Sequence, residues 1–163
     1  MNPAQEVRDK SILEGGERSI SIPSNISNLA EARRFVAETA AECGFSEDDI
    51  YAIKLAAGEA VANAVEHGSP DGESNRVTIT CLCKKSNFLV IVKDEGRFKK
   101  RVPGPTGENN YRGRGIPLML AVMDKVTIDE KSDGTRVTLT KALPAGSFSS
   151  ENGAAKASAA RKL

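Results

Sequence analysis

Glu59 and Asn63 are the two polar residues in a segment that is otherwise apolar and mostly small, GEAVANA at 58–64. Four positions apart on a helix, their side chains project about 40° apart around the axis and one turn apart along it, so both reach the same space. They bring a carboxylate and an amide there, and the alanines and Gly58 let a ligand approach closely. Gly58 costs roughly 1 kcal/mol of helix stability relative to alanine. The alternative is that both side chains lie on the solvated side of the helix.

Two further segments could complete a binding site. Asp94-Glu95-Gly96 directly follows an apolar run, and a carboxylate at the end of a strand can accept a hydrogen bond from an exocyclic amine. Gly113-Arg114-Gly115 precedes a helical pattern, where free backbone N–H groups and the helix dipole favour a phosphate. Each segment alone has another interpretation. Asp-x-Gly is common in turns, and the G-x-G matches neither a phosphate loop nor a dinucleotide-binding fingerprint.

The elements that must position these residues follow from hydrophobic periodicity and from capping and turn signals. The pattern predicts an edge strand at 19–22, then a helix with Ser27 as its cap and Gly44 as its breaker, and a second helix from Asp48 to about Glu66 opened by a Ser46-x-x-Asp49 capping box. It further predicts strands at 76–83 and 88–92, a helix at 116–124, and strands at 126–131 and 135–141. The connection at 97–112 is long and is typical of a lid. This order predicts an α+β two-layer sandwich, with helices on one face of a mixed, mostly antiparallel sheet.

Length and composition indicate one folded domain. The 163 residues are 39% apolar and 28% charged, with a formal net charge of +1. That charge gives no overall attraction to nucleic acid or to an anionic membrane. No signal-peptide pattern and no run of about 20 apolar residues is present, which predicts a cytoplasmic protein without a membrane anchor.

The three cysteines, Cys43, Cys81 and Cys83, lack the spacing of a zinc site, and their odd number indicates no disulfide framework. Cys81 and Cys83 stand two apart in a strand pattern and should point to one face. Free cysteine behaves there as a small apolar residue. The sequence therefore predicts a structural role for them.

Taken together and in order, the motifs resemble the GHKL superfamily of ATP-binding domains over residues 19–143. The resemblance rests on four motifs: Glu59-x-x-x-Asn63-Ala64-x-x-His67-Gly68 as the N box, Asp94-x-Gly96 and Gly113-x-Gly115 as two glycine boxes, and Gly134-Thr135 as the closing strand motif. The small size and the run RGRGIPLMLAVMDKV are most similar to bacterial anti-sigma-factor serine kinases. Phe98 stands where much of the superfamily has a further glycine, which implies a lid of different shape.

The resemblance implies a role for each matched residue. Glu59 would be the general base toward a substrate serine, and Asn63 would bind Mg²⁺. Asp94 would hydrogen-bond the adenine amino group with support from Thr135. The other residues expected to line the nucleotide are Gly96, Gly113, Arg114, Gly115 and Ile116. His67, the single histidine, is more simply explained as a structural residue at the end of a helix.

The function that this resemblance implies is that of an ATP-dependent protein serine kinase and anti-sigma factor. It would phosphorylate an anti-anti-sigma (STAS) protein, hold a sigma factor inactive and form a homodimer, with the strand edge at 19–22 as a place for pairing. The alternative is a nucleotide-dependent sequestering module without significant kinase activity, and a fortuitous match in a plain α+β domain is a third possibility. The domain is expected at 19–145, after an extension at 1–18 and before an Ala/Ser-rich tail at 146–163 that is predicted to be disordered.

Overall fold

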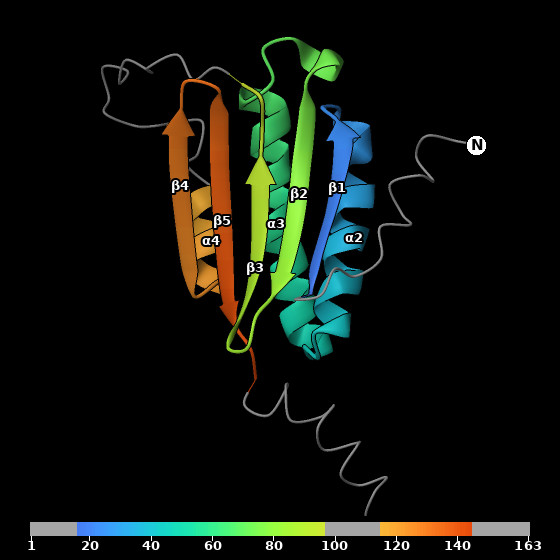
Figure 1. Ribbon diagram of the computed structural model, residues 1–163, viewed down its shortest axis with the longest axis vertical. Coiled ribbons are helices and arrows are strands. Elements are labelled where there is room, and N and C mark those ends of the chain that lie inside the picture. Colours follow the sequence, from blue (N-terminus) through green and yellow to red (C-terminus); the bar gives the residue numbers. More distant parts are fainter. Residues whose placement is uncertain (1–15, 97–114, 145–163) are drawn as a thin grey trace, which may run out of the picture.

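The computed structural model of the chain describes residues 16–96 and 115–144, and within these ranges the elements come in the predicted order. They are β1 (Glu17–Pro23), the 3-10 turn η1 (Ile26–Asn28), α2 (Leu29–Glu42), α3 (Glu47–His67), the 3-10 turn η2 (Gly72–Ser74), β2 (Arg76–Cys83), β3 (Asn87–Lys93), α4 (Gly115–Val122), β4 (Lys125–Lys131) and β5 (Gly134–Ala142). The strands form one 5-stranded sheet in the order β1-β2-β3-β5-β4 (Figure 1). β1 is therefore an edge strand, as predicted, and it begins two positions before the expected start.

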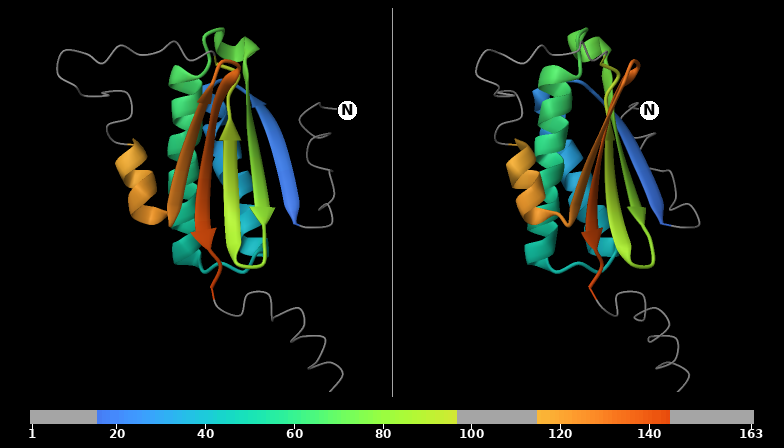
Figure 2. Two further views of the ribbon diagram at one scale, coloured as in Figure 1. Left: turned by 60° about the vertical axis from the view of Figure 1, so that its left-hand side comes forward. Right: turned by 90° about the vertical axis from the view of Figure 1, so that its left-hand side faces the viewer.

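The three α-helices cover one face of this sheet, and α3 lies between α2 and α4 (Figure 2). This confirms the α+β sandwich. The sheet was predicted as mixed, but every pairing among the described strands is antiparallel. β2–β3 and β4–β5 are hairpins, which are antiparallel by construction, and the connection through α2 and α3 places β2 antiparallel beside β1.

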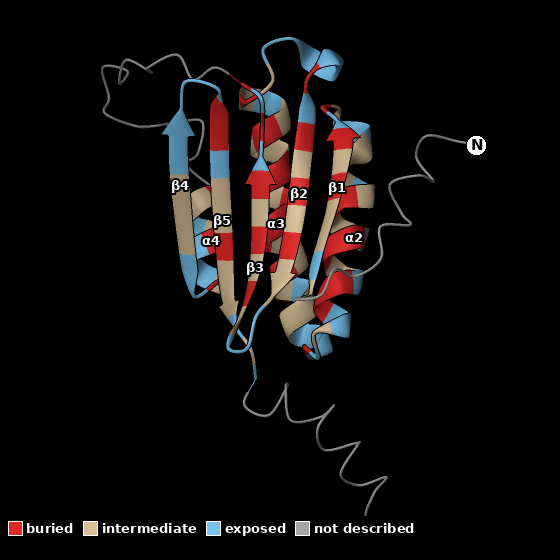
Figure 3. Ribbon diagram, viewed as in Figure 1, coloured by how far each residue is buried: buried red, intermediate tan, exposed pale blue. Residues whose placement is uncertain are grey.

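The core lies between the sheet and the helices. Alternate residues of β2 and β3 are buried, which gives the banded pattern of Figure 3. α3 contributes small residues to this layer, and Ala56, Ala57 and Ala60 are each at most 1% exposed. Small side chains bring the backbone of α3 close to the sheet, which fixes the position of the helix.

The two long helices begin in different ways. α3 begins as predicted, because the Ser46 hydroxyl accepts a hydrogen bond of 3.3 Å from the Asp49 N–H. For α2, Ser27 was the expected cap, and this prediction was wrong. The Asn25 side chain instead accepts the Ser27 N–H at 2.8 Å and caps the turn η1, which leads directly into α2.

The cysteine prediction was correct for Cys81 and wrong for the other two. Cys81 is fully buried as a free thiol, and burial raises its pKa to about 12. Cys43 and Cys83 are joined by a disulfide across 40 residues of sequence. Sequence spacing could not reveal this pairing, because only the packing of α2 on the sheet brings the C-cap of α2 to the last residue of β2.

Several predictions fall outside the described residues: the lid at 97–112, the tail at 146–163 and most of the extension at 1–18. Within the described ranges, no helix is long and apolar enough to cross a membrane.

Candidate functional site

Glu59 and Asn63 stand on successive turns of α3, and both are partly exposed. The first residue of α4, Gly115, lies against them. A Cβ atom at Gly115 would come within 3.1 Å of Asn63 Nδ2 and 3.2 Å of Glu59 Oε2. The N-terminus of α4, where backbone N–H groups lack helical partners, is thus placed beside a carboxylate and an amide. The predicted convergence of these three residues is found in the structure.

Asp94 follows β3 and is 5% exposed. Its Oδ1 atom accepts two backbone hydrogen bonds, from the N–H of Gly96 and from the N–H of Thr135, each at 3.0 Å. Its own N–H donates to the Thr135 carbonyl at 3.0 Å. These bonds hold the carboxylate in one orientation at the end of the strand, as the sequence predicted for this position.

Three glycines allow close packing around Asp94, and only the first of them faces its carboxylate closely. A Cβ atom at Gly68 would lie 2.1 Å from Asp94 Oδ2, and one at Gly134 would lie 2.1 Å from the Asp94 carbonyl oxygen. A Cβ atom at Gly96 would lie 2.2 Å from the Gly68 carbonyl oxygen. Such distances are well inside van der Waals contact, so no other residue type fits without movement of the backbone or of Asp94.

Thr135 lies next to Asp94 and is 4% exposed. Its hydroxyl is the one buried side-chain polar atom among the described residues that has no hydrogen-bond partner. A buried hydroxyl without a partner costs free energy, so it marks a place where a polar atom of a ligand fits.

Helix α3 connects the two parts of the site. Gly68, which contacts Asp94, is the C-cap of α3, and Glu59 is nine positions earlier on the same helix. At 1.5 Å per residue this places the two parts roughly 13 Å apart along the helix axis. The site is therefore elongated, with Asp94 and Thr135 at one end and Glu59, Asn63 and Gly115 at the other.

The remaining predicted residues have different outcomes. Ile116 is half-buried and packs against the core beside Gly115. Gly113 and Arg114 lie outside the described residues. Sequence reasoning did not place Gly68 and Gly134 against Asp94, although the motifs containing them, His67-Gly68 and the Asp133-Gly134 turn, were the available signal.

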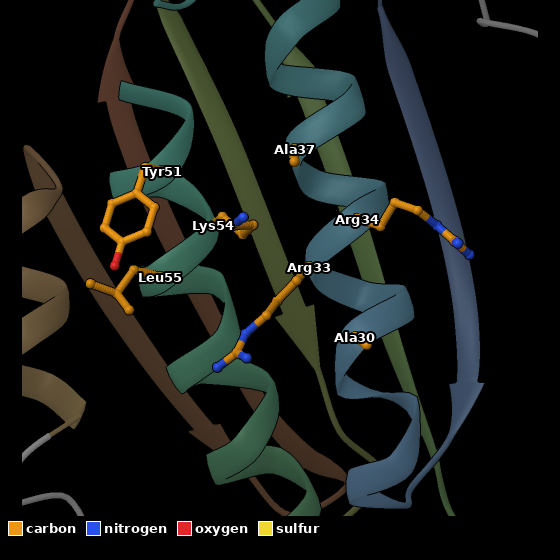
Figure 4. Close-up of a pocket in the computed structure, with 7 residues that line it drawn as sticks. All are labelled: Ala30, Arg33, Arg34, Ala37, Tyr51, Lys54 and Leu55. Carbon is orange, nitrogen blue, oxygen red and sulfur yellow. The ribbon is translucent and has the colours of Figure 1, made fainter. Parts of the chain in front are cut away.

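A groove of about 570 Å³ lies between α2 and α3, on the side away from the sheet (Figure 4). Its lining includes three cationic side chains, Arg33, Arg34 and Lys54, and the exposed ring of Tyr51. Figure 4 shows Arg33 reaching from α2 across to α3. Gly58 makes this possible, because a Cβ atom there would lie 2.5 Å from Arg33 Nε.

The cations of the groove form no ion pair with the described part of the chain. Among residues 16–96 and 115–144, no carboxylate is within ion-pairing distance of Arg33, Arg34 or Lys54. The groove was not predicted from the sequence, in which Gly58 was interpreted only as allowing close approach of a ligand.

Known proteins of one family match the sequence of this chain. The model of the histidine kinase-like ATPase domain matches residues 22–141. A serine-protein kinase RsbW of Bacillus velezensis is 29% identical over 76% of this chain and 84% of its own length. The anti-sigma F factor of Oceanobacillus iheyensis is 30% identical over 78% of this chain and 92% of its own length.

A solved structure agrees with these matches. A crystal structure of the RsbU and RsbW domains of Rv1364c from Mycobacterium tuberculosis aligns with 79% of this chain at a TM-score of 0.59 and 26% identity. The aligned part is 33% of that longer chain.

Proposed function

Because the chain belongs to the histidine kinase-like ATPase domain family, we propose that it is an ATP-dependent protein serine kinase and anti-sigma factor of a partner-switching module. The observation that carries this proposal is the convergence of Glu59 and Asn63 on the N-terminus of α4 at Gly115. The names of the similar proteins, serine-protein kinase RsbW and anti-sigma F factor, support it. The proposed substrate is an anti-anti-sigma protein of the STAS class, and the second proposed partner is a sigma factor.

The residues present fit ATP and Mg²⁺. The partnerless hydroxyl of Thr135 and the fixed carboxylate of Asp94 suit the base, and Gly115 leaves room beside Asn63 for phosphate oxygens. The Asn63 amide oxygen is a hard ligand of the kind Mg²⁺ prefers, and Asn63 would hold the ion. ATP supplies the phosphoryl group, and Mg²⁺ neutralises charge on the phosphates.

Glu59 is the proposed general base. Its carboxylate takes the proton of the substrate serine hydroxyl as that oxygen bonds to the γ-phosphorus, and the bond from the γ-phosphorus to the β,γ-bridging oxygen breaks. The electron pair leaves with ADP. The first turn of α4, which begins at Gly115 beside Glu59, presents free backbone N–H groups. These groups stabilise the negative charge that develops on the phosphoryl oxygens.

Incubation with γ-labelled ATP and a candidate STAS protein tests the proposal. The expected result is label on a serine of the partner. ATP binding and partner capture without label would instead support the alternative, a sequestering module that lacks significant kinase activity.

Asp94→Asn is expected to weaken ATP binding roughly 10–100-fold, the equivalent of losing a charge-assisted hydrogen bond of about 1.5–3 kcal/mol. The asparagine oxygen can keep the two bonds from Gly96 and Thr135, so the fold should persist. The amide NH₂ then takes the place of the other carboxylate oxygen. Because the NH₂ and the adenine amino group are both hydrogen-bond donors, no hydrogen bond forms between them. Preference for ATP over GTP should fall as well, which calorimetry with both nucleotides measures.

The matched control is Asp129→Asn, the same change at an exposed position of β4. It should bind ATP as the wild type does. Equal affinity of the Asp94→Asn protein and the wild type would show that Asp94 does not recognise adenine.

We further propose that the α2–α3 groove receives an acidic surface of the protein partner. Arg33 and Lys54 lie between the two helices, whereas Arg34 points toward β1 (Figure 4). The two cations between the helices favour a negatively charged occupant, and Tyr51 and Arg33 are of the types enriched at interface hot spots. Leu55 in the groove lies one turn before Glu59 on α3, so a partner bound there would be close to the proposed base.

Arg33→Glu should therefore weaken binding of the STAS partner about tenfold or more, because it reverses the charge of the side chain that reaches across to α3. Arg136→Glu, an exposed change on β5, is the control and should have little effect. Surface plasmon resonance at two salt concentrations measures both variants. If the two variants bind the partner equally well, the partner does not use the groove.

Two other expectations from the sequence stay proposals. The edge of β1 offers backbone groups for pairing in a homodimer, and a cytoplasmic location would suit a regulator of sigma factors.

A further inference from the structure

The Cys43–Cys83 disulfide lies at the opposite end of the sheet from the candidate site. Cys83 pairs with Phe88 near the start of β3, whereas Asp94 follows the end of that strand (Figure 1). The two Cα atoms are 6.2 Å apart, within the usual range for a disulfide. The bond connects the end of α2 to the end of β2, and the 40-residue separation includes all of α3.

An aromatic contact reinforces the same connection. Phe45, two residues after Cys43, packs edge-to-face on Phe88 with ring centroids 5.6 Å apart. The disulfide and this contact together hold the α2–α3 connection against the β2–β3 hairpin. α3 begins at Glu47, immediately after this connection. The disulfide and the aromatic contact therefore fix the start of the helix that carries Glu59 and Asn63.

The three cysteines differ in their capacity to react. Cys43 and Cys83 are only partly buried, so small oxidants and reductants can reach the pair. Cys81 is completely buried, and the raised pKa of its thiol leaves almost no thiolate at neutral pH. Exchange of the disulfide with this neighbouring thiol is thereby suppressed, and the pair acts as a separate redox unit.

We propose that Cys43 and Cys83 form a reversible redox clasp that sets the stability of the α2–α3 connection. Disulfides are transient in reducing compartments, so a cytoplasmic chain would form this one under oxidative stress. In the oxidation, two thiols give up two protons and two electrons to hydrogen peroxide. One S–S bond forms, the O–O bond breaks, and two water molecules are released. A small dithiol reverses the step by taking over the disulfide and returning two protons to the cysteines.

Oxidation stabilises the fold because the closed loop restricts the unfolded chain. The full chain, oxidised with hydrogen peroxide, should lose the mass of two hydrogen atoms and should melt roughly 10 °C higher than the chain in dithiothreitol. Hydrogen exchange at 37–45 should slow in the oxidised form. Cys81→Ala should keep all three responses, whereas Cys43→Ser and Cys83→Ser should lose them.

The comparison of the oxidised with the reduced wild-type chain needs no substitution. It therefore tests the proposal even where a serine variant folds poorly. The proposal is overturned by either of two results. One is the absence of an intramolecular disulfide after peroxide treatment, and the other is an equal melting temperature of the oxidised and reduced wild-type chains.

Discussion

Glu59→Gln is expected to slow phosphoryl transfer to the partner serine by ~10²–10⁴-fold, the usual effect of losing a general base. ATP affinity should stay close to that of the wild type, because glutamine keeps the size of the side chain and its contact with Gly115. Binding and chemistry would then be separated in one variant. Calorimetry measures the affinity, and a single-turnover assay with labelled ATP and excess partner measures the transfer.

The control for this variant is Glu38→Gln, which makes the same change at an exposed position of α2. It should transfer phosphate at the wild-type rate. Transfer at the wild-type rate by Glu59→Gln would show that Glu59 is not the base. The sequestering alternative predicts a different pattern, in which neither variant nor the wild type labels the partner.

Gly134→Ala is expected to lower the free energy of unfolding by roughly 3–5 kcal/mol, through backbone strain and overpacking together. Gly134 has a φ of 146°, which side chains rarely adopt, and its added Cβ atom would lie 2.1 Å from the Asp94 carbonyl oxygen. Relief of this overlap must move Asp94 or the backbone before Thr135, whose N–H donates to the Asp94 carboxylate, so ATP affinity should fall in any protein that remains folded.

Gly72→Ala separates the two causes. Gly72 also has a positive φ, of 58°, but nothing lies within 4 Å of the added Cβ atom. This control should lose only about 1–2 kcal/mol from strain and should keep its ATP affinity. Urea denaturation of both variants gives the comparison. An equal loss of unfolding free energy in the two variants would mean that overlap with Asp94 contributes nothing to the effect of Gly134→Ala.

Local patterns predicted most of the fold. The change from a 3.6-residue to a two-residue period located the helices and strands, and the Ser46 capping box located the start of α3. The start of α2 was placed wrongly because two residues, Asn25 and Ser27, could each have served as a cap. The choice between them depends on the path of the chain after β1, which local sequence does not determine.

The candidate site was predictable for residues that share one element or follow a strand directly. Glu59 and Asn63 are related by helix geometry, and Asp94 by its place after β3. The contacts between elements were not predictable from spacing. The three glycines around Asp94 come from three separate segments, and the passage of Arg33 over Gly58 depends on how α2 packs on α3. The Cys43–Cys83 disulfide depends on the packing of α2 on the sheet in the same way.

The passage of Arg33 over Gly58 also restricts which substitutions the chain can accept. A side chain at position 58 would move the guanidinium of Arg33 away from its place on α3, so glycine is required there only while Arg33 keeps this position. The glycine weakens the middle of the helix by roughly 1 kcal/mol relative to alanine. A chain that gave up Arg33 could recover that stability with alanine at position 58. In homologous chains, an arginine at position 33 that crosses α3 should therefore occur together with glycine at position 58.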